Sequence, residues 1–191
     1  MKKYLTLFTV VTLFAFLSCE KSELNEINNE RSPKEITEIT ECETAFGASD
    51  YCFSEDGFNR WGWVIGPLFE SEQKTIHEIW AGAGRCMTEN GALVGYLYVA
   101  YNDGVATITY DAEPGYIFTE THLYVGNDMY PLRRNGRPTV APGQYPYSEP
   151  VNGRTQRYIV DDLRDEIYVI AHSVVCPSDK EEDDDNDNEP N

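Results

Sequence analysis

The segment ALVGYLYVAYNDGVATITY, residues 92–110, establishes the fold class of this chain. β-Branched and aromatic residues recur at every second position, and Asn102-Asp103-Gly104 interrupts the alternation. An Asp-Gly pair between two such segments is the strongest short-range signal for a β-hairpin. In the first strand, the alternation predicts one face made of Leu93, Gly95, Leu97 and Val99, and a second made of Val94, Tyr96, Tyr98 and Ala100.

The rest of residues 42–177 has the same period of two. Five further segments are predicted as strands: RWGWVIG (60–66), KTIHEIWAG (74–82), YIFTETHLYVG (116–126), TQRYIVDDL (155–163) and EIYVIAHSVVC (166–176). Gly, Pro and Asn separate them, and no helical stripe of useful length occurs. The sequence therefore predicts one all-β domain at 42–177, an antiparallel β-sandwich of about seven or eight strands, immunoglobulin-like or jelly-roll-like.

Residues 1–18 predict export. Lys2 and Lys3 precede a mostly apolar run at residues 4–17, which is shorter than the roughly 20 residues of a membrane-spanning helix. The segment FLSC, residues 16–19, resembles the lipobox of bacterial lipoproteins, in which the cysteine is acylated. The resemblance implies a lipid anchor on Cys19. The charges in CEKSE, residues 19–23, resemble the signals that direct lipoproteins of Bacteroidota to the outside of the outer membrane, which implies exposure at the cell surface. Cleavage as a plain secretory signal is the alternative.

Two acidic segments flank the predicted domain. Residues 19–41 are rich in Glu, Asn, Ser and Thr with few apolar side chains, a composition that predicts a flexible tether. Residues 178–191 concentrate acids and predict a disordered tail. A calcium site at 183–187 is a weaker alternative, because the glycine turn and the final glutamate of a calcium-binding loop are missing.

The charge of the domain limits its partners. Residues 42–177 hold nine Lys or Arg against 18 Asp or Glu, a net charge of −9. Proteins that bind nucleic acids neutralise phosphates with clustered cations. The sequence therefore argues against a nucleic-acid partner.

The cysteines predict two disulfides. Cys42, Cys52, Cys86 and Cys176 remain once Cys19 is assigned to lipid, and an even number in an exported domain indicates disulfides. Of the three possible pairings we favour Cys42 with Cys52 and Cys86 with Cys176. A zinc site made of all four is the alternative, but it requires close Cys-x-x-Cys pairs that the sequence lacks.

Several segments together resemble a domain that recurs in secreted and surface proteins of Bacteroidota. In chain order they are ETAFG, CF, RWGW, GPL, AGAGRC, LVG, GYIFTETHLYVG, VAPGQYPY and IYVIAHSVVC, and they extend over nearly all of residues 43–176. The resemblance implies a secreted, β-rich module. Since no activity is firmly attached to that family, it implies no catalytic residue.

Histidine patterns suggest two chemical hypotheses. HEIWA, residues 77–81, begins like the zinc-protease pattern His-Glu-x-x-His, but Ala81 stands at the second ligand position and the segment is predicted as a strand. Glu120 and His122 share a strand face and, with His172, would form a metal or acid/base site if their strands were neighbours. A structural role for both histidines is favoured, and the sequence predicts no metal and no cofactor.

Other catalytic patterns are absent or uninformative. No Gly-x-Ser-x-Gly elbow marks a serine hydrolase. AGAGRC, residues 81–86, lacks the lysine and the helix of a phosphate-binding loop and is predicted as a tight turn. Carboxylate pairs for glycoside hydrolysis could come from Glu113, Glu120, Asp161, Asp162, Asp165 and Glu166, but 18 acids in the domain make a chance pair easy.

Aromatic and basic residues provide the candidate ligand-binding positions. Trp61 and Trp63 project to the same side of an extended RWGW segment, where they either stack on a sugar ring or fill the core. Two loops are predicted to face solvent. One carries Arg133, Arg134 and Arg137 around an Asn-Gly turn, and the other carries Tyr145 and Tyr147 between prolines.

These observations predict a lipid-anchored surface protein whose β-sandwich is a non-catalytic binding or adhesion module. The expected ligand is a glycan or a host or matrix protein, bound by the arginine and tyrosine loops. Two alternatives stay open. The domain is a glycan hydrolase that uses paired carboxylates, or it is a structural subunit of an outer-membrane surface complex.

Overall fold

The computed structural model describes residues 38–178 and confirms the all-β prediction for them. The predicted signal peptide, Cys19, most of the predicted tether and nearly all of the predicted tail lie outside the described residues. The described part contains ten strands, four short 3-10 segments and no α-helix. None of its helical segments is long and apolar enough to cross a membrane.

Ten antiparallel strands make up a single hydrogen-bonded sheet. They are β1 Glu43–Gly47, β2 Tyr51–Cys52, β3 Trp63–Leu68, β4 Thr75–Ala81, β5 Ala92–Asn102, β6 Val105–Ala112, β7 Tyr116–Gly126, β8 Tyr147–Gly153, β9 Thr155–Val160 and β10 Ile167–Pro177. The seven strands named from the sequence all exist. Three others, β1, β2 and β8, were not among them.

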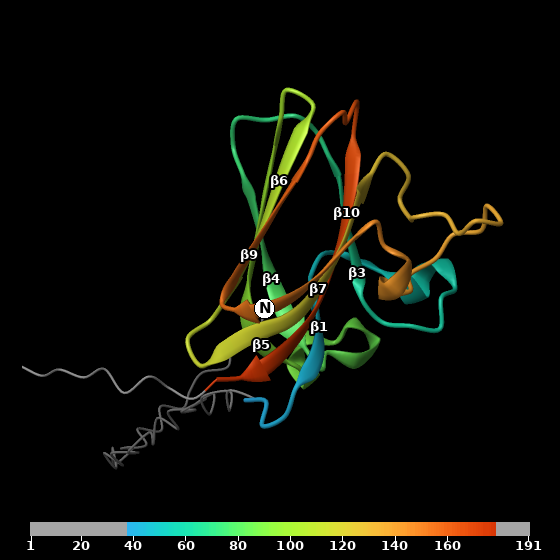
Figure 1. Cartoon of the computed structure of the whole chain (residues 1–191). Helices are drawn as coiled ribbons and strands as arrows, with labels where there is room; N and C mark the ends of the chain where they lie inside the picture. The colour runs from blue at the N-terminus through green and yellow to red at the C-terminus, as the bar shows by residue number, and fades with distance from the viewer. Residues whose placement is uncertain (1–37, 179–191) are drawn as a thin grey trace, which may run out of the picture. The chain divides into compact units, whose positions relative to one another are not determined.

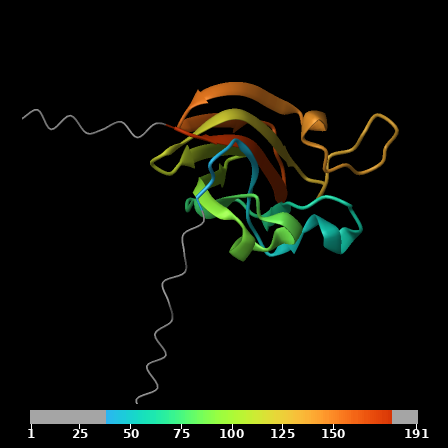
Figure 2. The same ribbon diagram turned by 90° about the horizontal axis from the view of Figure 1, so that it is seen from below.

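Strand β10 is the centre of the sheet. One of its edges pairs with β7, and the other pairs first with β3 and then with β1. From β1 the order continues through β4, β5, β6 and β9, while β8 pairs with the outer edge of β7. The sheet curls over, as in a β-sandwich, so that β7 and β8 face β6 and β9 in two layers (Figures 1 and 2).

The space between the layers is the main hydrophobic core. Ring contacts cross it from β6 to β7, where the centroids of Tyr110 and Phe118 are 5.8 Å apart, and from β8 to β9, where those of Tyr147 and Tyr158 are 6.2 Å apart. Tyr110 and Phe118 are fully buried. Ile39, in the predicted tether, also packs against this core.

The hairpin that established the fold class is confirmed. Strand β6 pairs over its whole length with residues 95–102 of β5, and Asp103 (φ 51°) and Gly104 (φ 73°) make the turn. Leu97 and Val99 share one face of β5, as predicted, and this face is buried.

The prediction for Leu93 is wrong. Along β4, Ile79 pairs with Gly95 but Trp80 pairs with Leu93, so Val94 is an extra residue in β5. A bulge of this kind inverts the side-chain alternation beyond it. Val94 is therefore buried at 0% exposure, and Leu93 lies on the opposite face.

A second hydrophobic cluster covers the outer face of β3, β10 and β7. It consists of strand residues such as Val64, Ile170 and Tyr124 together with residues from the connecting loops, among them Phe53 and Tyr145. The loops are thus packed on the sheet by an apolar layer of their own.

The predicted disulfide pairing is wrong, although both disulfides exist. Cys42 bonds to Cys176, and Cys52 bonds to Cys86. The strand order explains the first bond, because Glu43 of β1 lies opposite Val175 of β10 and brings the neighbouring cysteines together. The second ties β2 to the turn at residues 84–86, within the outer cluster.

Candidate functional site

Five side chains form a row across the outer face of the sheet. The strand registers place Ser148 of β8 opposite His122 of β7, His122 opposite His172 of β10, His172 opposite Phe46 of β1, and Phe46 opposite Trp80 of β4. Directly opposed residues of adjacent antiparallel strands have their side chains on the same face. The row runs from exposed Ser148 to half-buried Trp80 through three buried rings.

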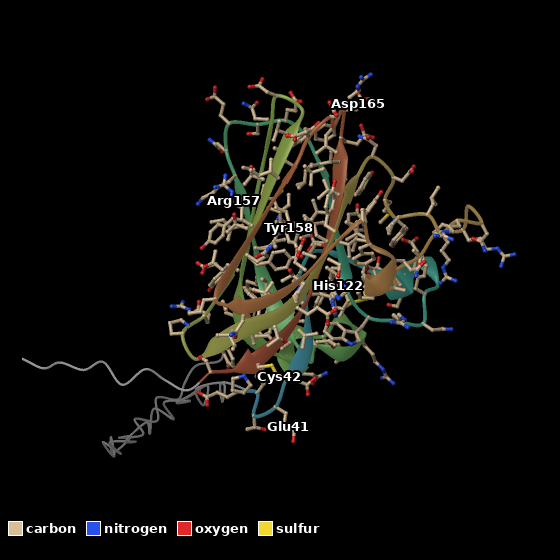
Figure 3. All side chains as sticks on the ribbon, in the orientation of Figure 1. Glu41, Cys42, His122, Arg157, Tyr158 and Asp165 are labelled. Carbon is tan, nitrogen blue, oxygen red and sulfur yellow. A yellow bond between two sulfur atoms is a disulfide. The ribbon has the colours of Figure 1, made fainter. Side chains whose placement is uncertain are left out.

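His122 is bonded at both ring nitrogens. Its Nδ1 lies 3.0 Å from Oγ of Ser148, and its Nε2 lies 2.9 Å from Oε1 of Glu120. Since a carboxylate only accepts hydrogen bonds, Nε2 carries the proton and donates it to Glu120. In the neutral ring Nδ1 is then the acceptor, and the hydroxyl of Ser148 donates to it. Figure 3 shows His122 in the middle of the molecule, on β7.

His172 has a different environment. It is 6% exposed, its Nδ1 has no hydrogen-bond partner, and its ring packs against that of Phe46 with centroids 4.8 Å apart. Burial, the neighbouring His122 and the positive charge of Arg60 lower the pKa of His172 to about 3. His172 is therefore a neutral imidazole at physiological pH.

The structure brings the two predicted histidines together, as one of the sequence hypotheses required. Their ring centroids are 5.2 Å apart. Within residues 38–178, however, no group of three or more His, Cys, Asp or Glu side chains is arranged to hold a metal ion. The chemistry available to this cluster is proton transfer between Ser148, His122 and Glu120.

Trp61 and Trp63 belong to the outer hydrophobic cluster, which agrees with the core alternative. Trp63 is 3% exposed. Trp61 is half-buried and packs edge-on against Phe46, at 5.1 Å between centroids, and against Trp63, at 5.9 Å.

The prediction that the loop with Tyr145 and Tyr147 faces solvent is wrong. Tyr145 is 6% exposed and donates a hydrogen bond from its hydroxyl to the carbonyl of Val140, at 3.2 Å. Burial raises the pKa of its hydroxyl well above the usual value. Tyr147 begins β8, is half-buried and packs against the main core. The loop therefore packs on the sheet through Tyr145, which belongs to the outer hydrophobic cluster.

The three predicted arginines lie on a protruding hairpin, which we call the arginine hairpin, residues 131–138. Arg133, Arg134 and Arg137 are exposed, and the turn at Asn135-Gly136 is closed by a 2.8 Å bond from the amide of Gly136 to the carbonyl of Arg133. Figure 1 shows this segment, in gold, extending to the right of the sheet. In the described part of the chain no carboxylate pairs with these guanidinium groups, since its single ion pair joins His122 to Glu120.

The remaining sequence candidates are dispersed. HEIWA is confirmed as strand, in β4, and AGAGRC forms a tight turn in which Gly82 has φ 64°. Asp161, Asp162, Asp165 and Glu166 lie between β9 and β10, whereas Glu113 follows the other end of β6 and Glu120 contacts His122. The structure does not gather these acids into one site.

Surface depressions lie away from the histidine row. One of about 340 Å³ is lined by Ser49, Asp50, Tyr51, Gly66, Pro67, Leu68 and His77. Another of about 300 Å³ lies between residues 38–43 and the segments around Ala81 and Gly91. Burial lowers the pKa of His77, which favours its neutral form.

Ser148 was not identified from the sequence. It lies in YSEPVNG, whose proline and asparagine are unusual in strands, and its partner His122 is 26 residues away. Only the pairing of β7 with β8 reveals the contact.

Comparisons with known proteins add no assignment. The chain matches no protein-family model, no curated protein and no solved structure.

Proposed function

We propose that this chain is a lipid-anchored cell-surface protein whose β-sandwich is a binding module, and that the arginine hairpin binds an anionic glycan. The lipobox-like segment ending at Cys19 and the resemblance to Bacteroidota surface domains support the location. Two disulfides within the domain agree with an extracytoplasmic location, because such bonds persist in oxidising compartments.

The proposal rests on three clustered arginines that have no carboxylate partner within the described residues. Arg133, Arg134 and Arg137 supply three of the nine basic residues of an acidic domain, and all three lie within five positions at the end of an exposed hairpin. Guanidinium groups bind sulfate and carboxylate through paired N–H donors. Three such groups without an internal carboxylate partner are available to an external anion.

The turn gives these cations a defined arrangement. The amide of Arg133 donates to the carbonyl of Arg137 at 2.9 Å, and the amide of Arg137 donates to Oδ1 of Asn135 at 3.1 Å. Leu132, at the base of the hairpin, is 55% exposed and offers an apolar surface to a ligand beside the three cations. A backbone fixed in this way loses less conformational entropy on binding than a free loop does.

The test is binding of a sulfated glycan fragment, such as a heparin oligosaccharide, to the purified domain. The triple variant Arg133→Ala/Arg134→Ala/Arg137→Ala should lose at least tenfold in affinity, and its melting temperature should remain that of the parent chain. Affinity of the parent should fall steeply with added salt, since these charges are exposed.

A charge-matched variant provides the control. Lys74→Ala/Arg157→Ala/Arg164→Ala removes the same number of cations from other parts of the domain, and Arg157 lies on the opposite side of the molecule from the hairpin (Figure 3). It should keep most of the affinity. Equal losses in the two variants would show a non-specific charge effect and would refute the hairpin as the site.

The anchor has its own test. Intact-mass analysis of the mature protein should show an acylated N-terminal Cys19, and the Cys19→Ser variant should leave the membrane fraction. An unmodified thiol at this position would contradict the anchoring.

A further inference from the structure

Ser148, His122 and Glu120 form a connected hydrogen-bonded group that the binding function does not use. We propose that this group is an acyl-transfer site, in which Ser148 is a nucleophile toward carboxylic esters. The site is on β7 and β8 and does not depend on the arginine hairpin.

The hydrogen bonds define the direction of proton transfer. Nε2–H of His122 donates to Glu120 at 2.9 Å, which leaves the lone pair of Nδ1 directed at Oγ of Ser148, 3.0 Å away. A serine becomes a nucleophile when a neighbouring base can accept its proton and a third group orients that base. Here His122 is the base, and Glu120 is a positioning residue that also stabilises the imidazolium formed during the reaction.

An acyl-transfer site requires an accessible nucleophile and a shielded base, and the exposure of Ser148 and His122 differs in this way. Ser148 is exposed, on a strand that pairs within the described residues only with β7, so an ester can reach its hydroxyl. His122 is 8% exposed and is held between its two partners. The base is therefore shielded from water, while the nucleophile is accessible.

The neighbouring imidazole defines the electrostatic setting of the group. His172 lies directly opposite His122, with ring centroids 5.2 Å apart, and burial lowers its pKa to about 3. His172 stays neutral, so it does not add a second positive charge next to His122 during proton transfer.

The reaction is an ordinary two-step hydrolysis. Oγ of Ser148 attacks the ester carbonyl carbon while its proton passes to Nδ1 of His122. The C–O bond to the alcohol then breaks, and His122 returns the proton to the leaving alcohol, which gives an acyl-serine. Water attacks the acyl-serine with His122 again as the base, and the carboxylic acid and the free serine are released.

The site differs from typical serine hydrolases in its base contact, which uses Nδ1 instead of Nε2 for the serine. General base catalysis alone contributes roughly 10² to 10⁴-fold. The expected activity is therefore modest, at the lower end of that range.

The test uses two probes on the purified chain: a fluorophosphonate that labels nucleophilic serines with loss of fluoride, and p-nitrophenyl acetate. Peptide mass spectrometry should place the phosphonate on Ser148. Ester hydrolysis should fall about 100-fold, toward the uncatalysed rate, in Ser148→Ala and in His122→Gln. Ser71→Ala, which removes an exposed hydroxyl that accepts a hydrogen bond from the backbone amide of Gln73, should change neither readout.

Glu120 variants separate positioning from folding. Glu120→Gln should slow labelling and Glu120→Asp should partly restore it, with melting temperatures equal to that of the parent. The arginine-hairpin triple variant should keep full labelling, which distinguishes failure of this proposal from failure of the binding function. Absence of a phosphonate on Ser148, or labelling that persists in folded His122→Gln, would overturn the proposal.

Discussion

His122 on β7 and His172 on β10 lie directly opposite each other, with ring centroids 5.2 Å apart, yet they differ in their polar contacts. His122 bonds to Ser148 and Glu120, whereas Nδ1 of His172 has no partner. Two adjacent imidazoles on one sheet face therefore have separate roles. His122 can transfer a proton, and His172 is a neutral packing residue.

The buried histidine predicts acid sensitivity. The pKa of His172 is about 3 in the folded chain and about 6.5 when unfolded, so between these pH values only the unfolded chain binds the proton. The contribution of His172 to the free energy of unfolding should be fully present above pH 6.5. As the pH decreases from there toward 3, the free energy of unfolding should fall by up to about 1.4 kcal/mol per pH unit. Urea unfolding measured from pH 7 to pH 4 checks this.

His172→Phe is the matched variant for that experiment. Phenylalanine keeps a ring against Phe46 and removes the buried nitrogen, so the variant should have a shallower pH dependence than the parent. Burial lowers the pKa of His77 as well, and this contribution stays in both chains. Parallel pH profiles for parent and variant would contradict the assignment to His172.

Gly95 is predicted to tolerate no side chain. A Cβ there would lie 2.4 Å from the carbonyl oxygen of Asp111, on the paired strand β6. Gly95→Ala should destabilise the domain by about 1–3 kcal/mol, because the strands must separate to admit the methyl group. Gly153→Ala is the control, since its Cβ would meet nothing within 4 Å. Thermal unfolding of both variants checks the difference, and equal melting temperatures would contradict it.

The hydrogen bond between Thr121 and Tyr158 is predicted to stabilise the two-layer arrangement. Their hydroxyls are 2.7 Å apart, and Thr121 is 0% exposed. Tyr158→Phe should cost about 1–3 kcal/mol, because it leaves the hydroxyl of Thr121 buried without its partner. Adding Thr121→Val should recover part of this loss. Additive effects in a double-mutant cycle, measured by denaturant unfolding, would show that the bond contributes nothing.

Tyr145 is predicted to be a stability residue rather than a ligand contact. Tyr145→Ala removes a buried ring from the outer cluster and should cost about 3–5 kcal/mol. Tyr51→Ala removes the same atoms from a side chain that is 48% exposed and should change stability by about 0.5 kcal/mol or less. Similar unfolding midpoints for the two variants would contradict the burial of Tyr145.

Both disulfides are predicted to contribute strongly to stability. Peptide mapping without reduction should yield the pairs Cys42–Cys176 and Cys52–Cys86. Replacing the first pair by alanine should cost about 5 kcal/mol and the second about 4 kcal/mol in the chain-entropy account, since the closed loops differ in length. A peptide joining Cys42 to Cys52 would contradict this pairing.

Much of the fold was predictable because its long strands have strong local signals. Strands β5, β6, β7 and β10 alternate regularly, and Asp103-Gly104 determines a turn by itself. Strands β1, β2 and β8 have five, two and seven residues, and β8 contains Pro150. Pairing with longer neighbours, and not local propensity, makes these three segments extended.

The candidate site was less predictable, because it depends on contacts between strands. The sequence placed Glu120 and His122 on one face correctly, but their neighbour Ser148 becomes visible only when β8 is paired with β7. The predicted cysteine pairing was wrong for the same reason, because the correct pairing depends on β1 lying beside β10.

The prediction that the tyrosine loop faces solvent was wrong for a related reason. Phe53, Tyr130 and Tyr145 lie in irregular segments without periodicity, so nothing in the local pattern distinguishes a loop that packs on the sheet from one that faces solvent. The arginine hairpin was recognised correctly as exposed because its charges and its Asn-Gly turn are both local features.

The bond between Cys42 and Cys176 also determines how the domain responds to mechanical load. Cys42 immediately precedes the first strand, and Cys176 is the second-to-last residue of the last one, 134 positions later. A pull applied to the chain before Cys42 and after Cys176 passes through this covalent link and leaves the intervening strands without tension. An extending force applied at the two ends therefore cannot unravel the strands between the two cysteines while this bond is intact.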